Sequence, residues 1–334
     1  MSEANHQPGY LLGVDVGTSK THALLADVYG EVVGFGEAGP GNYESVGEMG
    51  LEKALNQAAE AALRQAQVSK TDVMGMGFGL AGYDWPSERG VMARAIESLG
   101  ILAPYEIVND VVIGLVAGAS EGWGVAVDAG TGNNVRGRDQ TGRTGRITGN
   151  SASFGEIGGA GELVWQGIIA ATYAWTKRGP QTSLTKVFMD YAEVETEDEL
   201  IEGLVMERIH LPPFLAQQII QTAVKGDPVA LQIVQKTACE LALNTNAVIR
   251  QLDFQDQAFE VILIGSLFKA GEIYIQPFRE TIQAFAPRAK LIQLSVPPVV
   301  GAVLLAGEAA GLESASIRDS LVRSTAAWMG FYDE

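Results

Sequence analysis

The sequence predicts an α/β protein in which one folding unit occurs twice. The chain has 334 residues, enough for two domains of ordinary size. Strand-like apolar segments alternate with helical segments in both halves. A short Asp-x-Gly-Thr turn closes an apolar strand at residues 14–18 and again at 127–131, and a hairpin with Gly30 or Gly142 in its turn follows each copy. Because the turn recurs together with its surroundings, we interpret the pattern as an internal duplication.

The first unit contains five predicted strands and three predicted helices. Short apolar runs rich in β-branched residues predict strands at 10–16, 21–28, 31–37, 73–78 and 105–108. Helical spacing of apolar residues predicts helices at 51–67, 87–99 and 110–117. The Gly-, Pro- and Asn-rich stretch between 39 and 50 predicts a loop.

The same kind of pattern then begins again. Predicted strands lie at 123–127, 134–138, 143–148, 261–264 and 290–294. Predicted helices lie at 156–177, 183–191, 197–206, 213–223, 228–252, 277–286, 299–310 and 316–328. The second unit is therefore longer than the first, because helical segments separate its hairpin from its fourth strand.

Composition and charge exclude several classes of protein. The formal net charge of −17 argues against a nucleic-acid binder, which usually presents a basic face. An acidic chain can still bind phosphates, through backbone N–H groups and Mg²⁺. The single cysteine, Cys239, excludes an intramolecular disulfide and a cysteine-ligated cluster within one chain. The first residues are polar and the apolar stretches are too short to span a bilayer, so we expect a cytoplasmic protein that binds no membrane.

The paired turns predict phosphate binding. Each glycine lets backbone N–H groups approach an anion, each threonine adds a donor, and each aspartate can hold Mg²⁺ through water. Two such turns that face each other would clamp a triphosphate. Competing motifs are absent: Lys20 follows Ser19 and not the glycine of a P-loop, and no G-x-G-x-x-G opens a helix after the first strand. The three histidines lie in no zinc-peptidase or serine-hydrolase motif.

Two further turns follow strands. Asp110 stands where a predicted strand meets a helix, and either Asn109 or Asp110 could cap that helix. A carboxylate at a strand end could also accept the proton of an acceptor hydroxyl during phosphoryl transfer. Gly265-Ser266 follows the late strand, where a glycine would let an adenine ring lie against the backbone, although a simple strand-to-helix turn explains it as well.

Together these segments resemble the N-acetylglucosamine kinase and BadF/BadG/BcrA/BcrD-type ATPase family of the actin-like superfamily, over residues 10–311. The stretch GVDVGTSKTHALLADVYGEVVGFGEAGPGN is similar to the family's first phosphate motif, and VDAGTGNN to its second. VNDVVIGLVAG is similar to the segment with the catalytic aspartate, and VILIGSLFKAG to the adenosine motif.

The resemblance implies a duplicated actin-like (ribonuclease H-like) fold, with two lobes, a five-stranded mixed sheet in each, and the nucleotide in the cleft between them. We expect the first lobe to span residues 1–120, completed by a C-terminal helix at 315–334, and the second to span 121–314. It also implies a homodimer.

The resemblance further implies an ATP-dependent kinase that acts on a small sugar, N-acetylglucosamine or glucosamine, with ATP and Mg²⁺. Asp110 would be the general base and Asp15 would organise the metal. The residues expected to contact the phosphates are Gly17, Thr18, Lys20, Thr21, Thr131 and Gly132. Those expected to border the adenosine are Gly265 and Ser266. Those expected to bind the sugar are Asn42, Asn134 and Glu156.

One segment departs from the family pattern. Sugar kinases of the family carry G-D-E-G, whereas this chain has Gly155-Glu156-Ile157-Gly158. Glu156 is a methylene longer than aspartate and Ile157 removes a carboxylate, so we expect altered discrimination among sugar hydroxyls. Two other functions stay open. One is an ATPase that drives a partner protein, which the lone cysteine disfavours. The other is a non-catalytic sugar-binding regulator, which the presence of Asp110 disfavours.

Overall fold

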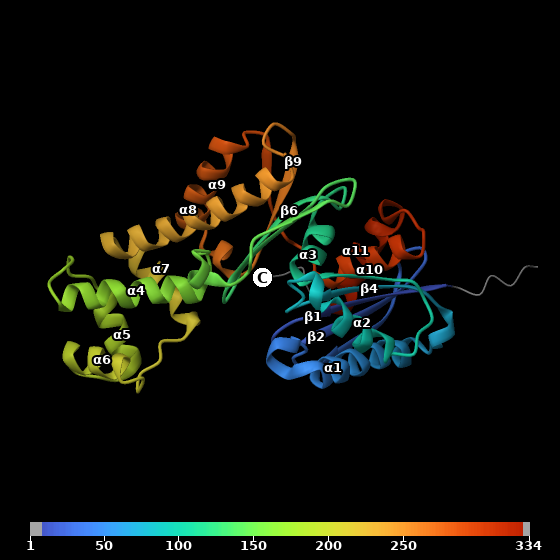
Figure 1. Ribbon diagram of the computed structural model, residues 1–334, viewed down its shortest axis with the longest axis horizontal. Coiled ribbons are helices and arrows are strands. Elements are labelled where there is room, and N and C mark those ends of the chain that lie inside the picture. Colours follow the sequence, from blue (N-terminus) through green and yellow to red (C-terminus); the bar gives the residue numbers. More distant parts are fainter. Residues whose placement is uncertain (1–8, 330–334) are drawn as a thin grey trace, which may run out of the picture.

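Two five-stranded mixed sheets form the two lobes seen in Figure 1, in a computed structural model that describes residues 9–329. The first sheet has the order β3-β2-β1-β4-β5, and the second has the order β8-β7-β6-β9-β10. The strands of the first sheet are β1 (Tyr10–Val16), β2 (Thr21–Asp27), β3 (Val32–Ala38), β4 (Val73–Leu80) and β5 (Tyr105–Asn109). Those of the second are β6 (Gly124–Ala129), β7 (Asn133–Arg138), β8 (Thr144–Arg146), β9 (Phe259–Ile264) and β10 (Ala289–Gln293).

The two sheets have the same topology. β1 runs antiparallel to β2 and parallel to β4, and β6 runs antiparallel to β7 and parallel to β9. Both central strands are buried on both faces, as expected for strands covered by helices. The predicted duplication and the predicted pair of five-stranded sheets are confirmed.

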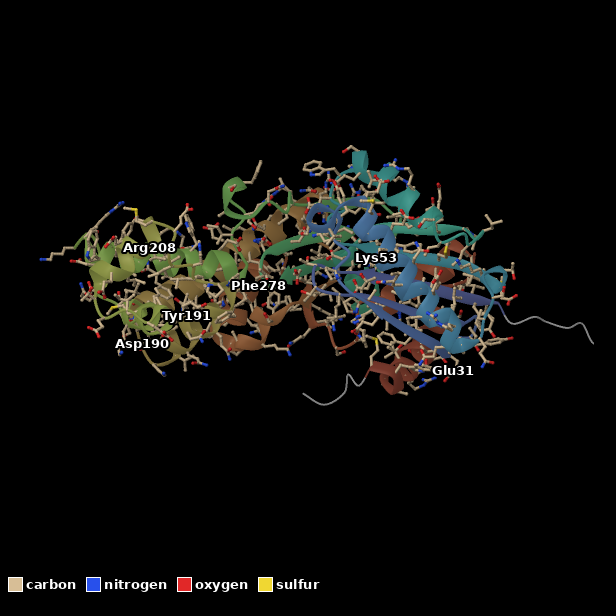
Figure 2. All side chains as sticks on the ribbon, turned by 90° about the horizontal axis from the view of Figure 1, so that it is seen from below. Glu31, Lys53, Asp190, Tyr191, Arg208 and Phe278 are labelled. Carbon is tan, nitrogen blue, oxygen red and sulfur yellow. The ribbon has the colours of Figure 1, made fainter. Side chains whose placement is uncertain are left out.

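The helices of the first lobe come from both ends of the chain. They are α1 (Tyr43–Ala66), α2 (Arg89–Glu97), α3 (Asp110–Gly118), α10 (Val299–Ala309) and α11 (Ser314–Met329). α10 packs against β4, β1 and α3, and α11 packs against α10 and β3. In Figure 2, Glu31 lies beside the red α11 helix, where Ser324 accepts a hydrogen bond from Val32 N at 3.1 Å. The chain therefore returns to the first lobe before α10, which differs from the boundary predicted at residue 314.

Six helices belong to the second lobe. They are α4 (Ala160–Trp175), α5 (Leu184–Ala192), α6 (Glu197–Val205), α7 (Ala216–Val224), α8 (Pro228–Gln251) and α9 (Glu272–Phe285). Figure 2 shows Asp190, Tyr191 and Arg208 at the far end of this lobe, away from Lys53 in the first. Short 3₁₀ turns complete the fold: η1 (Lys70–Asp72), η2 (Pro86–Glu88), η3 (Ser151–Phe154), η4 (Pro213–Leu215) and η5 (Ser266–Ala270). Within residues 9–329, no helix combines the length and the apolar character that a membrane span requires.

Glycines let α10 lie directly on the first sheet. All residues of α10 from Val299 to Gly307 are buried, so the helix needs apolar contacts all round. A Cβ atom at Gly77 of β4 would overlap the carbonyl oxygen of Ala302, and one at Gly13 of β1 would overlap the backbone of Val303. The close approach of helix and sheet therefore depends on these two positions having no side chain.

We expect Gly77→Ala to lower the free energy of unfolding by about 1–3 kcal/mol, because the added methyl group forces α10 away from the sheet. Urea denaturation measures the effect. Gly90→Ala is the matched control, because a Cβ there meets only the end of the Arg94 side chain at 3.7 Å. Equal stability of the Gly77 variant and wild type would contradict this account of the packing.

Candidate active site

The first Asp-x-Gly-Thr turn joins β1 to β2 and is held by backbone hydrogen bonds. Gly17 N donates to Lys20 O at 2.9 Å, and Gly41 N donates to Gly17 O at 3.1 Å. Ala81 N donates to Val16 O at 2.9 Å, which ties the end of β1 to the loop after β4. The turn is therefore fixed on both sides, and it presents Thr18, Ser19 and Lys20 at the exposed end of the strand pair.

The second turn joins β6 to β7 and has a helix directly behind it. Ala160 N donates to Gly130 O and Gly161 N donates to Thr131 O, both at 2.9 Å. These residues form the first turn of α4, so the turn is fastened to the beginning of that helix. The N–H groups of Ala160 and Gly161 are taken up by this attachment, and the helix therefore fixes the position of the turn.

Both turns open onto one cavity of about 360 Å³. Its lining includes Asp15 from the first turn, Asp128 from the second, and Asp110 from the start of α3. The other predicted phosphate contacts in its lining are Gly17, Thr18 and Lys20. Ser19 and His22 also line the cavity, although neither was predicted. The structure thus brings the three aspartates together from two lobes.

Burial and mutual repulsion make these aspartates poor acids. Each keeps partial contact with solvent through the cavity. Desolvation, followed by the charge of Asp110, raises the pKa of Asp15 to about 7 and that of Asp128 to about 7. Desolvation and then the charge of Asp84 raise the pKa of Asp110 to about 6. Three carboxylates that resist ionisation beside one another form a site suited to a cation.

Asn109, and not Asp110, caps α3. The Asn109 side chain accepts a hydrogen bond from Val111 N at 3.1 Å, in the position of an N-cap residue. Asp110 is the first residue of the helix, and its Oδ1 accepts from the same N–H at 3.0 Å. Because Asn109 takes the structural role, the second carboxylate oxygen of Asp110 keeps its acceptor capacity for chemistry.

The donor set fits Mg²⁺ bound through water and phosphate. Within residues 9–329, no group of three or more His, Cys, Asp or Glu side chains has the geometry of a direct metal cage. Mg²⁺ in kinases usually retains several waters and takes one or two carboxylates together with substrate phosphates. Asp15 and Asp128, whose pKa values are raised by burial, match that pattern, and Lys20 is the cation whose charge lowers the pKa of Asp15.

A second cavity, of about 560 Å³, adjoins the second turn. Thr131 and Ser266 lie in its lining, together with Phe214 from η4 and Gln217 from α7. Gly265 has φ +100°, and a Cβ there would overlap the backbone of Ala129, so only glycine fits this turn. An apolar cavity with a few amide and hydroxyl groups beside a phosphate turn suits a nucleoside.

The residues predicted to bind sugar line neither of these cavities. Asn42 caps α1, and a Cβ on Gly82 would meet its Oδ1. The Asn134 side chain acts to lower the pKa of Asp84, and its buried Oδ1 has no partner within the described residues. Glu156 is buried, and its carboxylate accepts bonds from Thr148 N at 2.7 Å, Thr148 Oγ1 at 2.8 Å and Gly149 N at 2.9 Å. The Glu156 oxygens are thus engaged in fixing a loop next to Asn134.

Some predicted positions lie outside these cavities, and some site residues were missed. Thr21 is fully buried, and its hydroxyl donates to Gly39 O at 3.0 Å, so it braces the loop before Asn42. Gly132 lines neither cavity. Its backbone lies directly against Gly159, where an added Cβ would overlap it. Asp84 was missed: Asn109 Nδ2 donates to its Oδ1 at 3.2 Å, and Arg136 pairs with it from the other lobe. The Asp-Trp-Pro sequence after β4 was the only available signal.

The fold and the site define a two-lobed α/β protein with one acidic cavity shared by both lobes. Residues 12–306 match the BadF/BadG/BcrA/BcrD ATPase family, and the chain belongs to that family.

Similar proteins include kinases of amino sugars. The chain is 26% identical to the N-acetylmuramic acid/N-acetylglucosamine kinase of Clostridium acetobutylicum, over 89% of this chain and 98% of the relative. It is 25% identical to the N-acetyl-D-glucosamine kinase of Dictyostelium discoideum, over 88% of this chain and 97% of the relative. The fold is shared with a candidate N-acetylglucosamine kinase from Chromobacterium violaceum, with a TM-score of 0.64 and 22% identity over 90% of this chain and 99% of that one. A ROK family glucokinase from Streptomyces griseus, solved with glucose and AMPPNP, matches with a TM-score of 0.53 and 20% identity over 90% and 99% of the two chains.

We expect Asp128→Asn to stabilise the protein at pH 8 in the absence of Mg²⁺. A carboxyl group whose pKa is raised on folding supports stability below the unfolded pKa of 3.8, and that support is lost as the pH rises through the folded value of about 7. Asparagine removes the buried charge. That charge destabilises the folded protein by about 1.4 kcal/mol for each unit by which folding raises the pKa. Urea unfolding at pH 4 and pH 8 measures the effect.

The gain in unfolding free energy should be a few kcal/mol at pH 8 and near zero at pH 4. Asp190→Asn is the control, because Asp190 lies exposed in an ion pair with Lys186 at 2.8 Å and such pairs contribute little. A variant less stable than wild type at pH 8 would show that the Asp128 carboxylate is not under repulsion.

Proposed function

We propose that this chain is an ATP-dependent sugar kinase that transfers the γ-phosphoryl group to a hydroxyl of an amino sugar, with N-acetylglucosamine or glucosamine as the acceptor. The observation that carries the proposal is the cavity shared by Asp15, Asp110 and Asp128 from both lobes. Family membership and two amino-sugar kinases that match along nearly their whole length support it.

The cavities divide the proposed work between the lobes. Thr131 and Ser266 border the nucleoside, with Gly265 in the turn directly before Ser266, and the two turns hold the triphosphate between them, with Gly17, Thr18 and Lys20 on one side. Asp15 and Asp128 would hold Mg²⁺ through water. When bound, Mg²⁺ neutralises charge on the phosphates.

Asp110 receives the proton of the acceptor hydroxyl. Its pKa of about 6 suits a base that is ionised at neutral pH and still basic enough to accept a proton. Asn42 and Asn134 orient the sugar, and Glu156 acts through the loop that it holds. Closure of the two lobes over the sugar would exclude water and limit wasteful ATP hydrolysis. Homodimer formation stays a prediction of the family resemblance, and a cytoplasmic location stays a prediction from the sequence.

We expect Asp110→Asn to lower kcat for sugar phosphorylation by about 10²–10⁴-fold, because the general base is lost. The Kd for Mg·ATP should change far less than kcat, because Asp110 is assigned to the acceptor hydroxyl and acts on Asp15 and Asp128 only through its charge. A coupled assay of ADP release measures turnover, and calorimetry measures nucleotide binding. Turnover at the wild-type rate by the variant would remove Asp110 from the mechanism.

The substrate class is tested by the same assay across N-acetyl sugars, amino sugars and neutral hexoses, with a no-sugar control. The proposal expects ADP release only when an amino sugar or its N-acetyl derivative is present. ADP release at one rate with or without sugar would instead identify an ATPase that drives a partner. Sugar binding without any ADP release would identify a non-catalytic regulator.

A further inference from the structure

A line of contacts runs from β7 of the second lobe to the general base in the first. Arg136 on β7 pairs with Oδ1 of Asp84, which follows β4. Asn109 Nδ2 donates to the same carboxylate oxygen at 3.2 Å and to Tyr83 O at 3.3 Å. Asn109 directly precedes Asp110 in the chain. Asp84 therefore lies between an arginine of one lobe and the residue next to the base in the other.

Asn109 extends these contacts to the first turn of α3. Its Oδ1 accepts a hydrogen bond from Val111 N at 3.1 Å, and Oδ1 of Asp110 accepts from the same N–H at 3.0 Å. Because both side chains are fastened to one backbone group, a movement of Asn109 would displace the Asp110 carboxylate. Catalytic groups are sensitive to such shifts, since a misplacement of about 1 Å can lower a rate about 10²-fold.

Arg136 and Asp84 carry their charges into the interior. The side chain of Arg136 is 7% exposed and that of Asp84 is 20% exposed. Charges withdrawn from water lose solvation, and apolar side chains of similar volume often stabilise such a position at least as well. A buried ion pair can instead specify one arrangement of the chain. The pair is thus better explained by the geometry that it fixes than by a gain in stability.

The pair also crosses the boundary between the lobes. Arg136 belongs to the second sheet, whereas Asp84 follows β4 of the first. α3 packs against α10 of the first lobe and also touches β6 and β7 of the second (Figure 1). Arg146, from β8 of the same hairpin, lies over the Trp85 ring, 4.2 Å from its centroid, and donates to the carbonyl oxygen of Asp84. Of the two arginines, only Arg136 contacts the carboxylate oxygen that Asn109 bonds.

The two charges of the pair act on the base in opposite directions. In addition to burial, the charge of Asp84 raises the pKa of Asp110, and the charge of Arg136 lowers it. Removal of Arg136 alone would leave the Asp84 charge without its counterion beside the base. The pair therefore affects both the position of Asp110 and the charge around it.

We propose that Arg136 is a positioning residue of the kinase: through Asp84 and Asn109 it fixes the first turn of α3. Asp110 is then held in position to accept the proton only while the second lobe is docked against the first. This inference rests on the proposed sugar-kinase function and adds a residue of the other lobe to the support of its base. Arg136 lines neither the cavity of the three aspartates nor the nucleoside cavity.

Backbone hydrogen exchange tests the positioning without any turnover. Mass spectrometry follows the peptide that contains Val111, whose N–H is bonded by both Asn109 and Asp110. We expect this peptide to exchange about tenfold faster in Arg136→Gln than in wild type, because the first turn of α3 opens more often. Unchanged exchange would overturn the inference.

Steady-state kinetics test the effect on the base. Arg136→Gln should lower kcat for sugar phosphorylation by about 10–100-fold and leave the KM for ATP within about twofold of wild type. Arg136→Lys keeps the charge and should turn over faster than Arg136→Gln. Asp84→Asn should resemble Arg136→Gln, and the double variant should be no slower than the slower single variant, because both residues act through one line of contacts. If Arg136→Gln does not fold, Arg136→Lys and Asp84→Asn carry the same test.

Arg138→Gln is the matched control. Arg138 lies on the same strand and also crosses to the first lobe, where it pairs with Glu308 of α10 at 3.2 Å. This pair is partly exposed and includes neither Asp84 nor Asn109, so kcat should stay within about twofold of wild type. An equal loss of kcat in Arg136→Gln and Arg138→Gln would show that any contact between the lobes has this effect, and the specific role of Arg136 would be wrong.

Failure of this inference differs from failure of the proposed function. If no sugar stimulates ADP release by wild type, the kinase function fails, and hydrogen exchange still decides whether Arg136 fixes α3. If wild type phosphorylates the sugar and the Arg136 variants keep its kcat, the kinase function stands and Arg136 is not a positioning residue.

Discussion

The confinement of three aspartates between two lobes is the constraint on which the site depends. Asp15, Asp110 and Asp128 come from separate elements, and the charge of Asp110 adds to burial in raising the pKa of both Asp15 and Asp128. An arrangement of this kind is costly for the empty protein, because buried like charges repel. A divalent cation with a triphosphate would bring the missing charges and hydrogen-bond partners. The empty protein is therefore less stable because of these carboxylates, and binding of the cation and the triphosphate would restore that stability.

Helix α3 connects this charge cluster to both lobes. It begins at Asp110, packs against α10 and β4 of the first lobe, and also touches β6, β7 and β9 of the second. A change in the angle between the lobes would therefore move the surroundings of the general base. The pair between Asp84 and Arg136 crosses the same boundary, and Asn109 holds Asp84 from the base's own side. Lobe closure and the position of the base are physically coupled through these contacts.

Much of the fold follows from local sequence patterns. The repeated turn, the hairpins and the alternation of strands with helices predicted both sheets, because their signals lie within short windows. Boundaries set by tertiary contacts were missed. α1 has a short helical segment that begins at Tyr43 and is capped by Asn42, and the predicted helix follows it after a kink at the non-helical Gly47. α9 contains Pro277 instead of starting there, since buried Tyr274 and Phe278 hold the turns on either side. α10 joins the first lobe through glycines far away in sequence.

Some residues of the candidate site could likewise be predicted from local sequence patterns, and others could not. The turns and Asp110 could be found because each lies at the end of an apolar strand. The pair between Asp84 and Arg136 could not, because only the assembled lobes bring these two residues together. The bonds of Glu156 lie within one irregular loop, residues 148–156, which no periodic pattern marks. Glu156 shows the difference clearly: its sequence position indicated a sugar contact, and its hydrogen bonds show a brace for residues 148–150.

The most direct test of the paired turns is a crystal structure of the chain with Mg²⁺, a non-hydrolysable ATP analogue and N-acetylglucosamine. We expect the β- and γ-phosphates between the turns at Gly17 and Thr131, the metal within water-mediated reach of Asp15 and Asp128, and a sugar hydroxyl at Asp110. A nucleotide bound elsewhere, with the crevice between the two turns left free of phosphate, would contradict the account.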